Sequence, residues 1–206
     1  MEEAVMLDRQ SAGPRLAAVV MASGDSRRFG QTDKLLMPVK GCPMLAHVLR
    51  ALPMPLFWRR VVVTRNEAVA DLAVQEGFEP LFHSLPDVSD TIRLGVTAVR
   101  QADGCLFSVG DQPFLTAATV ERLARRFADA PDAIVRVCYG ERDGNPVVFP
   151  KALFDELASL QPGQTGSAVI RRHAGCLVRC QAEHARELWD VDTREDYRAL
   201  EARGEG

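Results

Sequence analysis

Short apolar runs alternate with segments of helical periodicity along most of the chain. Residues 16–22 (LAAVVMA) form a continuous apolar run that ends near Gly24, which is typical of a strand buried on both faces of a sheet. The same kind of run predicts strands at 60–64, 78–83, 104–109, 133–138, 146–149, 176–180 and 187–191, with a loop at 140–145. Helices are predicted at 43–52, 67–76, 89–102, 151–160 and 166–173, with two more capped by Thr116 and Thr193.

This alternation of strand and helix favours an α/β fold. We expect a Rossmann-like three-layer α/β/α sandwich whose sheet is mixed but mostly parallel. Residues 16–206 are predicted to form a single domain, preceded by a loose N-terminal tail at 1–15. Because ligands of such sheets bind beyond the carboxyl ends of the strands, the loops that follow the strands are the places to look for chemistry.

Composition narrows the class of protein. The 206 residues are 47% apolar and 26% charged, and the net charge of -3 gives no basic footprint for nucleic acid. No apolar run is long enough to span a bilayer, and the acidic N-terminus does not resemble a secretory signal, so we expect a cytoplasmic protein without a membrane partner. The five cysteines contain no CxxC pair, so a metal site at Cys176 and Cys180 is disfavoured.

The loop after the first strand carries glycines and cations. Residues 21–30 read MASGDSRRFG, and Lys34 follows shortly after. Exposed backbone N–H groups around Gly24 can cradle an anion, and Arg27, Arg28 and Lys34 can offset the charge of a triphosphate. Neither the P-loop pattern nor GxGxxG fits the segment. A glycine turn with surface arginines is the alternative.

Two further loops are acidic. Asp111 follows the buried run at 104–109 in the sequence GDQP, where a carboxylate can ligate Mg²⁺, although a local turn would also explain it. Asp190 and Asp192 are two apart at a predicted strand end, so they should share one face. A helix cap is the alternative for Asp192. Ser89 is predicted to cap the helix at 89–102, because its hydroxyl can accept a backbone N–H.

Together these motifs resemble those of the molybdopterin nucleotidyltransferases, the MobA-like family. The resemblance rests on the motifs A-x-G-x-S-x-R-F-G-x-x-D-K-L-L, SDTIRLG, GDQP, GNP and WDVDT, in the family order, and extends over about 16–200. It implies the nucleotide-diphospho-sugar transferase type of fold. The nucleotide-binding residues that it implies are Ala22, Ser23, Gly24, Ser26, Arg28, Lys34, Ser89 and Asp111. Arg28, Lys34 and Asp111 would be catalytic, Asp111 and Asp192 would hold Mg²⁺ with Asp190 nearby, and Gly144, Asn145 and Pro146 would bind the acceptor.

The resemblance implies transfer of CMP from CTP to the phosphate of a molybdopterin-type cofactor, with release of pyrophosphate and a molybdenum hydroxylase apoenzyme as a later partner. Cytidylyl members usually carry Ala, and guanylyl members Gly, where this chain has Ser23; GDQP also favours CTP. Gln164 and Ala168 depart from the family pattern near the expected acceptor pocket. A guanylyltransferase, a transferase with another phosphorylated acceptor, and a non-catalytic cofactor carrier or chaperone remain alternatives.

Overall fold

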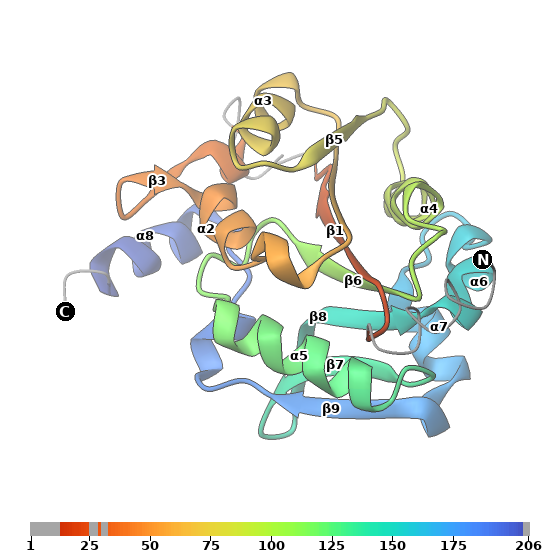
Figure 1. Ribbon diagram of the computed structural model, residues 1–206. Coiled ribbons are helices and arrows are strands. Elements are labelled where there is room, and N and C mark those ends of the chain that lie inside the picture. The colour runs from red at the N-terminus through yellow and green to blue at the C-terminus, as the bar shows by residue number, and fades with distance from the viewer. Residues whose placement is uncertain (1–12, 25–28, 30–32, 204–206) are drawn as a thin grey trace.

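The computed structural model describes residues 13–24, 29 and 33–203 (Figure 1). A seven-stranded sheet has the order β5-β4-β1-β6-β8-β7-β9. Its strands are β1 (Leu16–Ala22), β4 (Arg59–Thr64), β5 (Glu79–Phe82), β6 (Gly104–Val109), β7 (Ile134–Tyr139), β8 (Arg142–Pro150) and β9 (Leu177–Gln181). Only β8 runs antiparallel to its neighbours in this sheet of the described chain, so the predicted mixed, mostly parallel sheet is confirmed.

Helices cover both faces of the sheet. One face is covered by α2 (Met44–Arg50), α3 (Glu67–Gln75) and α5 (Ala117–Asp129), and the other by α4 (Val88–Ala98), α6 (Phe154–Ala158) and α7 (Gly166–Arg172). Alternate residues of each central strand supply the two cores, because successive side chains of a strand point to opposite faces. Val20 packs in the first core and Val19 in the second. The predicted three-layer α/β/α sandwich is confirmed.

Smaller elements complete the chain. The hairpin of β2 (Pro38–Val39) and β3 (Cys42–Pro43) precedes α2, and α8 (Arg194–Arg203) lies beside it near the C-terminus (Figure 1). Single turns are η2 (Lys34–Leu36), η3 (Met54–Leu56), η4 (Lys151–Leu153), η5 (Ala174–Cys176) and η6 (Ala185–Leu188). A third apolar cluster, with Phe29, Met44, Val191 and Tyr197, joins these parts. The start of α8 therefore packs against the segment that carries Lys34.

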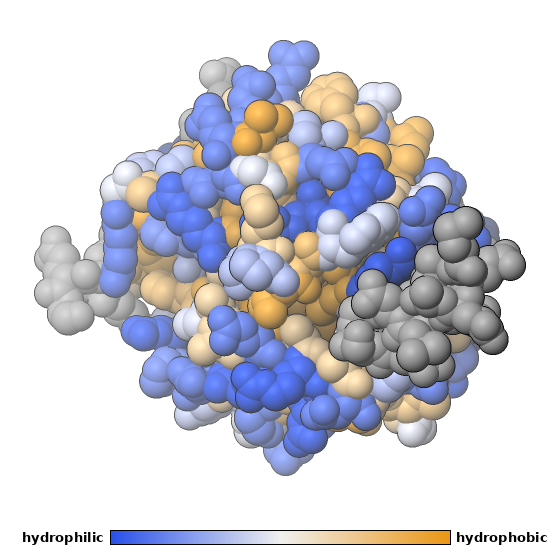
Figure 2. All heavy atoms as spheres, viewed as in Figure 1, coloured by the Kyte–Doolittle hydropathy of each residue, from blue (hydrophilic) through white to orange (hydrophobic). Residues whose placement is uncertain are grey.

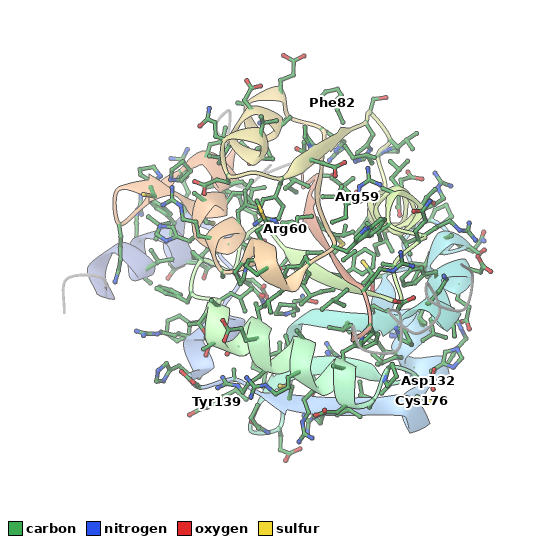
Figure 3. The ribbon with its side chains drawn as sticks, viewed as in Figure 1. Arg59, Arg60, Phe82, Asp132, Tyr139 and Cys176 are labelled. Carbon is green, nitrogen blue, oxygen red and sulfur yellow. The ribbon has the colours of Figure 1, made fainter. Side chains whose placement is uncertain are left out.

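The surface is polar over much of the face seen in Figure 2, and strongly hydrophilic side chains gather over α5 and β9. Exposed aromatic side chains lie at two strand ends, Phe82 on β5 and Tyr139 on β7 (Figure 3). Within the described residues, no helix combines the length and the apolar composition that a bilayer crossing requires.

The cap of α4 differs from the prediction. Asp87, and not Ser89, is the N-cap: its carboxylate accepts the N–H of Ser89 at 2.9 Å, and Asp90 completes a capping box. Ser89 lies inside the first turn and is buried. The carboxylate of Asp87 captures the free N–H groups at the start of the helix, two residues before the position predicted for the cap. The predicted caps Thr116 and Thr193 are confirmed.

The predicted strand at 187–191 is wrong. The chain forms η6 and then an extended segment that pairs with no strand of the described sheet. Glu187 is buried, and its carboxylate accepts hydrogen bonds from the backbone N–H groups of Thr116, Glu183 and His184. These bonds turn the backbone away from the sheet edge. The predicted loop at 140–145 is mostly strand as well, because β8 already begins at Arg142.

Candidate nucleotide and metal site

The candidate site lies at the carboxyl edge of the parallel strands. Ser23 and Gly24 follow β1, Arg65 follows β4, and Asp111 follows β6. The backbone N–H of Gly110 donates to the carbonyl of Met21 at 3.1 Å, which holds the first and third of these loops together. Strand order alone thus brings three predicted site residues to one edge, as expected of an open α/β sheet.

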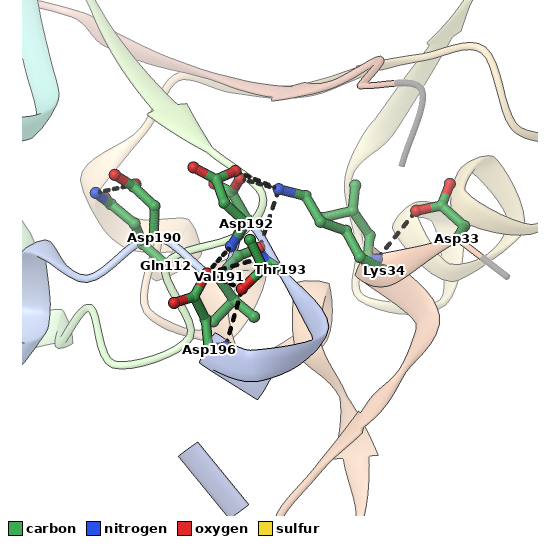
Figure 4. Close-up of polar contacts among 10 residues, drawn as sticks. Asp33, Lys34, Gln112, Asp190, Val191, Asp192, Thr193 and Asp196 are labelled. Atoms are coloured by element: carbon green, nitrogen blue, oxygen red, sulfur yellow. Dashed lines mark hydrogen bonds and ion pairs between the residues drawn. The ribbon is translucent and has the colours of Figure 1, made fainter. Parts of the chain in front are cut away.

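Lys34 joins the two acidic loops. Its Nζ lies 2.6 Å from Oδ2 of Asp111, 3.0 Å from Oδ1 of Asp192 and 3.0 Å from the carbonyl oxygen of Val191 (Figure 4). The side chains of Lys34 and Asp111 are 13% and 18% exposed. Burial opposes the charge of Lys34, but the contacts with Asp111 and Asp192 outweigh it and raise the pKa of the ammonium. The ammonium therefore remains charged at neutral pH.

Asp111 and Asp192 are the described residues that could hold a cation between them, because the ammonium of Lys34 already bridges their oxygens. Carboxylate oxygens are the donors that Mg²⁺ prefers, and Mg²⁺ is commonly bound by one or two carboxylates together with substrate phosphates. No group of three or more His, Cys, Asp or Glu side chains able to hold a metal ion is found within 13–24, 29 and 33–203. The two carboxylates thus fit a metal that arrives with a nucleotide.

Asp190 lies apart from this bridge. Its Oδ1 accepts from Nε2 of Gln112 at 2.8 Å, and the two side chains lie on the far side of Asp192 from Lys34 (Figure 4). Burial, with the nearby charge of Asp111, raises the pKa of Asp190. Gln112 is buried, and its Oε1 has no partner in the described part of the chain. The prediction that Asp190 and Asp192 share one face of a strand is wrong, since no strand forms there.

A cavity of about 320 Å³ opens at this edge. The predicted residues that line it are Ala22, Ser23, Gly24, Lys34 and Asp111. Ser26 and Arg28 lie outside the described residues, as does Arg27. Ser89 is not among the described lining residues, and the start of α4 contributes Asp87 and Thr91 in its place. The first turn of this helix therefore lines the cavity, as expected, through residues next to Ser89.

Arg65 and His83 belong to this region and carry no motif signal. Arg65 lines the cavity, and its Nε donates to the carbonyl of Ser23 at 2.9 Å. His83 Nδ1 accepts the N–H of Leu85 at 3.2 Å, and Nε2 lies 2.8 Å from the hydroxyl of Ser23. The hydroxyl is also 3.0 Å from the carbonyl of Val63, so its one proton goes there and His83 Nε2 is the donor. Burial, with the charge of Arg65, lowers the pKa of His83. The sequence offered one signal that Arg65 belongs to the site, namely its position directly after a predicted parallel strand.

A second cavity of about 270 Å³ adjoins the first and shares Met21, Val88 and Val109 with it. Its walls are mainly apolar, and its polar side chains are Arg136, Asn145, Thr165 and Ser167. Of the predicted acceptor residues, Asn145 lines this cavity. Gly144 and Pro146 are not among its described lining residues. Gly144 instead contacts a lining residue, because its carbonyl accepts a hydrogen bond from Nε of Arg136 at 3.1 Å. It is also closely packed, since an added Cβ would lie 2.7 Å from Cγ of Leu188.

The cysteines take no part in either cavity. Cys176 is exposed next to β9, and Cys180 is buried within that strand (Figure 3). The five thiols are free. The histidines at 47, 83, 173 and 184 form no cluster with other metal-binding side chains among the described residues.

Comparison with solved structures agrees with this arrangement. A homologue of Rv0371c from Mycobacterium sp. strain JC1 superposes with a TM-score of 0.77 and is 26% identical, over 92% of this chain and 96% of the other. Rv0371c of Mycobacterium tuberculosis H37Rv, in a complex with manganese, has a TM-score of 0.70 and 25% identity, over 91% and 98%. The α/β architecture described above is therefore that of nucleotidyltransferases of the nucleotide-diphospho-sugar transferase fold.

Sequence relatives agree as well. A molybdenum cofactor guanylyltransferase from Cupriavidus taiwanensis is 27% identical, over 91% of this chain and 97% of its own length. The bifunctional protein GlmU of Rhodospirillum rubrum is 33% identical over 68% of this chain, which spans only about a third (32%) of GlmU. The family model of the MobA-like NTP transferase domain matches residues 18–176. The chain therefore belongs to the MobA-like NTP transferase family, and it is a nucleotidyltransferase of that type.

Proposed function

We propose that this protein transfers CMP from CTP to the terminal phosphate of a molybdopterin-type molybdenum cofactor and releases pyrophosphate. The observation that carries the proposal is the bridge of Lys34 between Asp111 and Asp192, at the wall of a polar cavity that adjoins an apolar one. A nucleotidyltransferase needs this combination: a charged half-site for a triphosphate and a neighbouring half-site for the acceptor. A molybdenum hydroxylase apoenzyme would receive the product.

The proposed phosphoryl transfer needs no catalytic histidine or other general base. The acceptor phosphate is already ionised near neutral pH, so no general base is needed, and the protein has mainly to align it with the α-phosphate. Mg²⁺ held by Asp111 and Asp192 would neutralise charge on the triphosphate and on the departing pyrophosphate. Lys34 would leave the two carboxylates and bind on the α-phosphate side. That Rv0371c was solved in a complex with manganese supports the use of a divalent cation.

The apolar cavity supports a flat heterocyclic acceptor. Ile92, Phe107 and Phe149 offer apolar contact, and only a few polar groups, among them Arg136 and Asn145, are available to a bound molecule. Ligand sites of this kind use apolar walls for affinity and a few polar groups for orientation. A sugar acceptor would leave many hydroxyl groups without partners, which costs binding free energy. A pterin confines its polar groups to the ring edge and has two flat faces that apolar side chains can cover.

Ser23 supports CTP as the donor. Its hydroxyl proton is used by the carbonyl of Val63, so towards a base the oxygen can only accept. An exocyclic amino group, such as that of cytosine, satisfies this oxygen, and the carbonyl of uracil does not. GTP is the second candidate, because the Cupriavidus taiwanensis relative is a guanylyltransferase and guanine also carries an amino group.

Thermal stability with CTP, GTP, ATP and UTP, with and without Mg²⁺, tests the donor, because a ligand that binds only the folded state raises the melting temperature. We expect a magnesium-dependent rise with CTP, and pyrophosphate release once molybdopterin is added. Asp111→Asn should abolish both, whereas Asp132→Asn, at an exposed site far from the cavity, should change neither. A rise with GTP alone would reassign the base. No response to any nucleotide would contradict the transferase proposal and favour a cofactor carrier.

A further inference from the structure

A groove of about 420 Å³ lies between α5 and β9, outside both cavities described above. Four arginines line it, Arg122, Arg125, Arg126 and Arg179, with Asp129 as the one acidic side chain among its described lining residues. This is the hydrophilic region over α5 and β9 in Figure 2. The whole chain has a net charge of -3, so the groove is a local reversal of the overall charge.

The pattern of α5 concentrates these arginines. Arg122, Arg125 and Arg126 stand at i, i+3 and i+4, which places them on one side of the helix. Val120, Leu123 and Phe127 face the core. The helix therefore presents a row of guanidinium groups beside the last strand of the sheet.

Charge in the groove is only partly compensated. Arg122 pairs with Glu183 at 2.7 Å, and Arg179 pairs with two carboxylates, Asp143 at 2.7 Å and Glu141 at 3.1 Å. For Arg125 and Arg126 no hydrogen bond or ion pair is seen within the described chain, and both are exposed. Nε of Arg122 is buried and has no partner there either. The guanidinium groups of Arg125 and Arg126 are therefore the ones available to attract a carboxylate-rich partner.

The neighbouring backbone offers a second means of binding. β9 is the last strand of the described sheet and pairs with β7 on one side only. An unpaired strand edge can add an extended segment of another protein through main-chain hydrogen bonds. We propose that this groove docks an extended, acidic segment of a partner protein, which pairs with β9 and directs carboxylates to the arginines of α5.

Two other occupants fit the groove less well. A second copy of this chain, paired through β9, would bring two arginine rows together, and like charges so placed repel each other. Single-stranded nucleic acid is usually held by aromatic stacking as well as by charge, and no aromatic side chain is among the described lining residues.

The probe for this proposal is a fluorescein-labelled octapeptide of alternating Glu and Val, titrated with the full chain and followed by fluorescence anisotropy. We expect binding that weakens between ~50 mM and ~200 mM salt, because the contacts are electrostatic. The double variant Arg125→Glu, Arg126→Glu should bind at least about tenfold more weakly. Both side chains are exposed and no hydrogen bond is seen for them in the described structure, so the variant should remain folded, which a cooperative melting transition would show.

The matched control is Arg171→Glu with Arg198→Glu, which makes the same charge change at exposed helical arginines elsewhere. Equal weakening in this control would overturn the proposal, since net charge alone would then explain the binding. Tighter binding of a single-stranded oligonucleotide of equal charge would overturn the class of partner. Hydrogen exchange should slow at 177–181 when the peptide binds, and unchanged exchange would exclude pairing with β9.

Discussion

Among single residues, Lys34 is the counterion of two carboxylates, those of Asp111 and Asp192. Substitution Lys34→Met would leave Asp111 and Asp192 without the charge that holds them together. We expect unfolding free energy to fall by about 1–3 kcal/mol, the usual cost of removing one partner of a buried polar contact. Mg²⁺ should bind the nucleotide-free variant more tightly, because the ammonium no longer competes, while transferase activity is lost.

Calorimetric titration with Mg²⁺ and chemical denaturation measure the two effects. Lys151→Met, at an exposed lysine in η4, is the control and should change neither quantity. Weaker Mg²⁺ binding in Lys34→Met than in the wild type would contradict a shared cation position.

Protonation of a single residue, His83, should make the stability of the folded protein depend on pH. Its pKa is lowered in the folded protein, chiefly by burial and then by Arg65. The unfolded chain therefore binds the proton first. The stability that this neutral imidazole contributes is fully present above the unfolded pKa of about 6.5, and it is lost as the pH falls through the lower folded pKa.

The melting temperature should accordingly fall more steeply for the wild type than for His83→Gln between about pH 7 and pH 5. Gln keeps a donor for Ser23 but does not titrate. His184→Gln, at an exposed histidine, should retain the wild-type slope. Parallel curves for His83→Gln and the wild type would show that the pKa of His83 is the same in the folded and unfolded states.

Asp87 connects two elements. Its carboxylate caps α4 and also accepts the N–H of Gly163, with both oxygens at 3.0 Å, in the segment that leads into α7. That segment ends at Thr165, which lines the apolar cavity of about 270 Å³, while Asp87 itself lines the cavity of about 320 Å³. The carboxylate of Asp87 thus connects the walls of the two cavities.

Asp87→Asn should speed hydrogen exchange at 161–165 and raise the KM for the acceptor several-fold, with little change in kcat, because the wall becomes looser and the reacting groups are untouched. Asp90→Asn is the matched control: it weakens the same capping box but has no bond to Gly163. Each variant should lower the stability of α4 through the weaker cap. Similar exchange at 161–165 in both variants would contradict the anchoring role of Asp87.

Gly144 shows how the whole molecule positions the acidic loop. A Cβ at this point of β8 would lie 2.7 Å from Cγ of Leu188, which immediately precedes the segment that carries Asp190 and Asp192. We expect Gly144→Ala to displace that segment, to lower activity more than about tenfold, and to cost about 1–3 kcal/mol of stability through overpacking.

Gly175→Ala is the matched control, because nothing lies within 4 Å of an added Cβ there. Activity and denaturation of the two variants should be measured together. Full activity in Gly144→Ala would mean that Leu188 can move without disturbing Asp192.

The sequence by itself determined the central strands at 16–22 and 104–109 and the caps Thr116 and Thr193. Continuous apolar runs must be buried, and cap residues satisfy N–H groups a few positions away, so both signals are local. Residues after parallel strands meet at one edge whatever the loops do. Ser23, Gly24 and Asp111 could be found for this reason, whereas Lys34 and Asp192 were singled out by the resemblance to the family and were brought to them by the tertiary structure.

Only the tertiary structure decided those local conformations that depend on hydrogen bonds to residues far away in the sequence. Asp87 displaced Ser89 as the cap of α4 and gained Gly163 from another element. Glu187 ended the predicted strand at 187–191 because its carboxylate bonds to Thr116, far away in the chain. The hydrogen bond between His83 and Ser23 joins residues that follow two different strands, so no periodicity in the sequence predicts it. Such choices follow from which buried polar groups find partners, and that depends on packing.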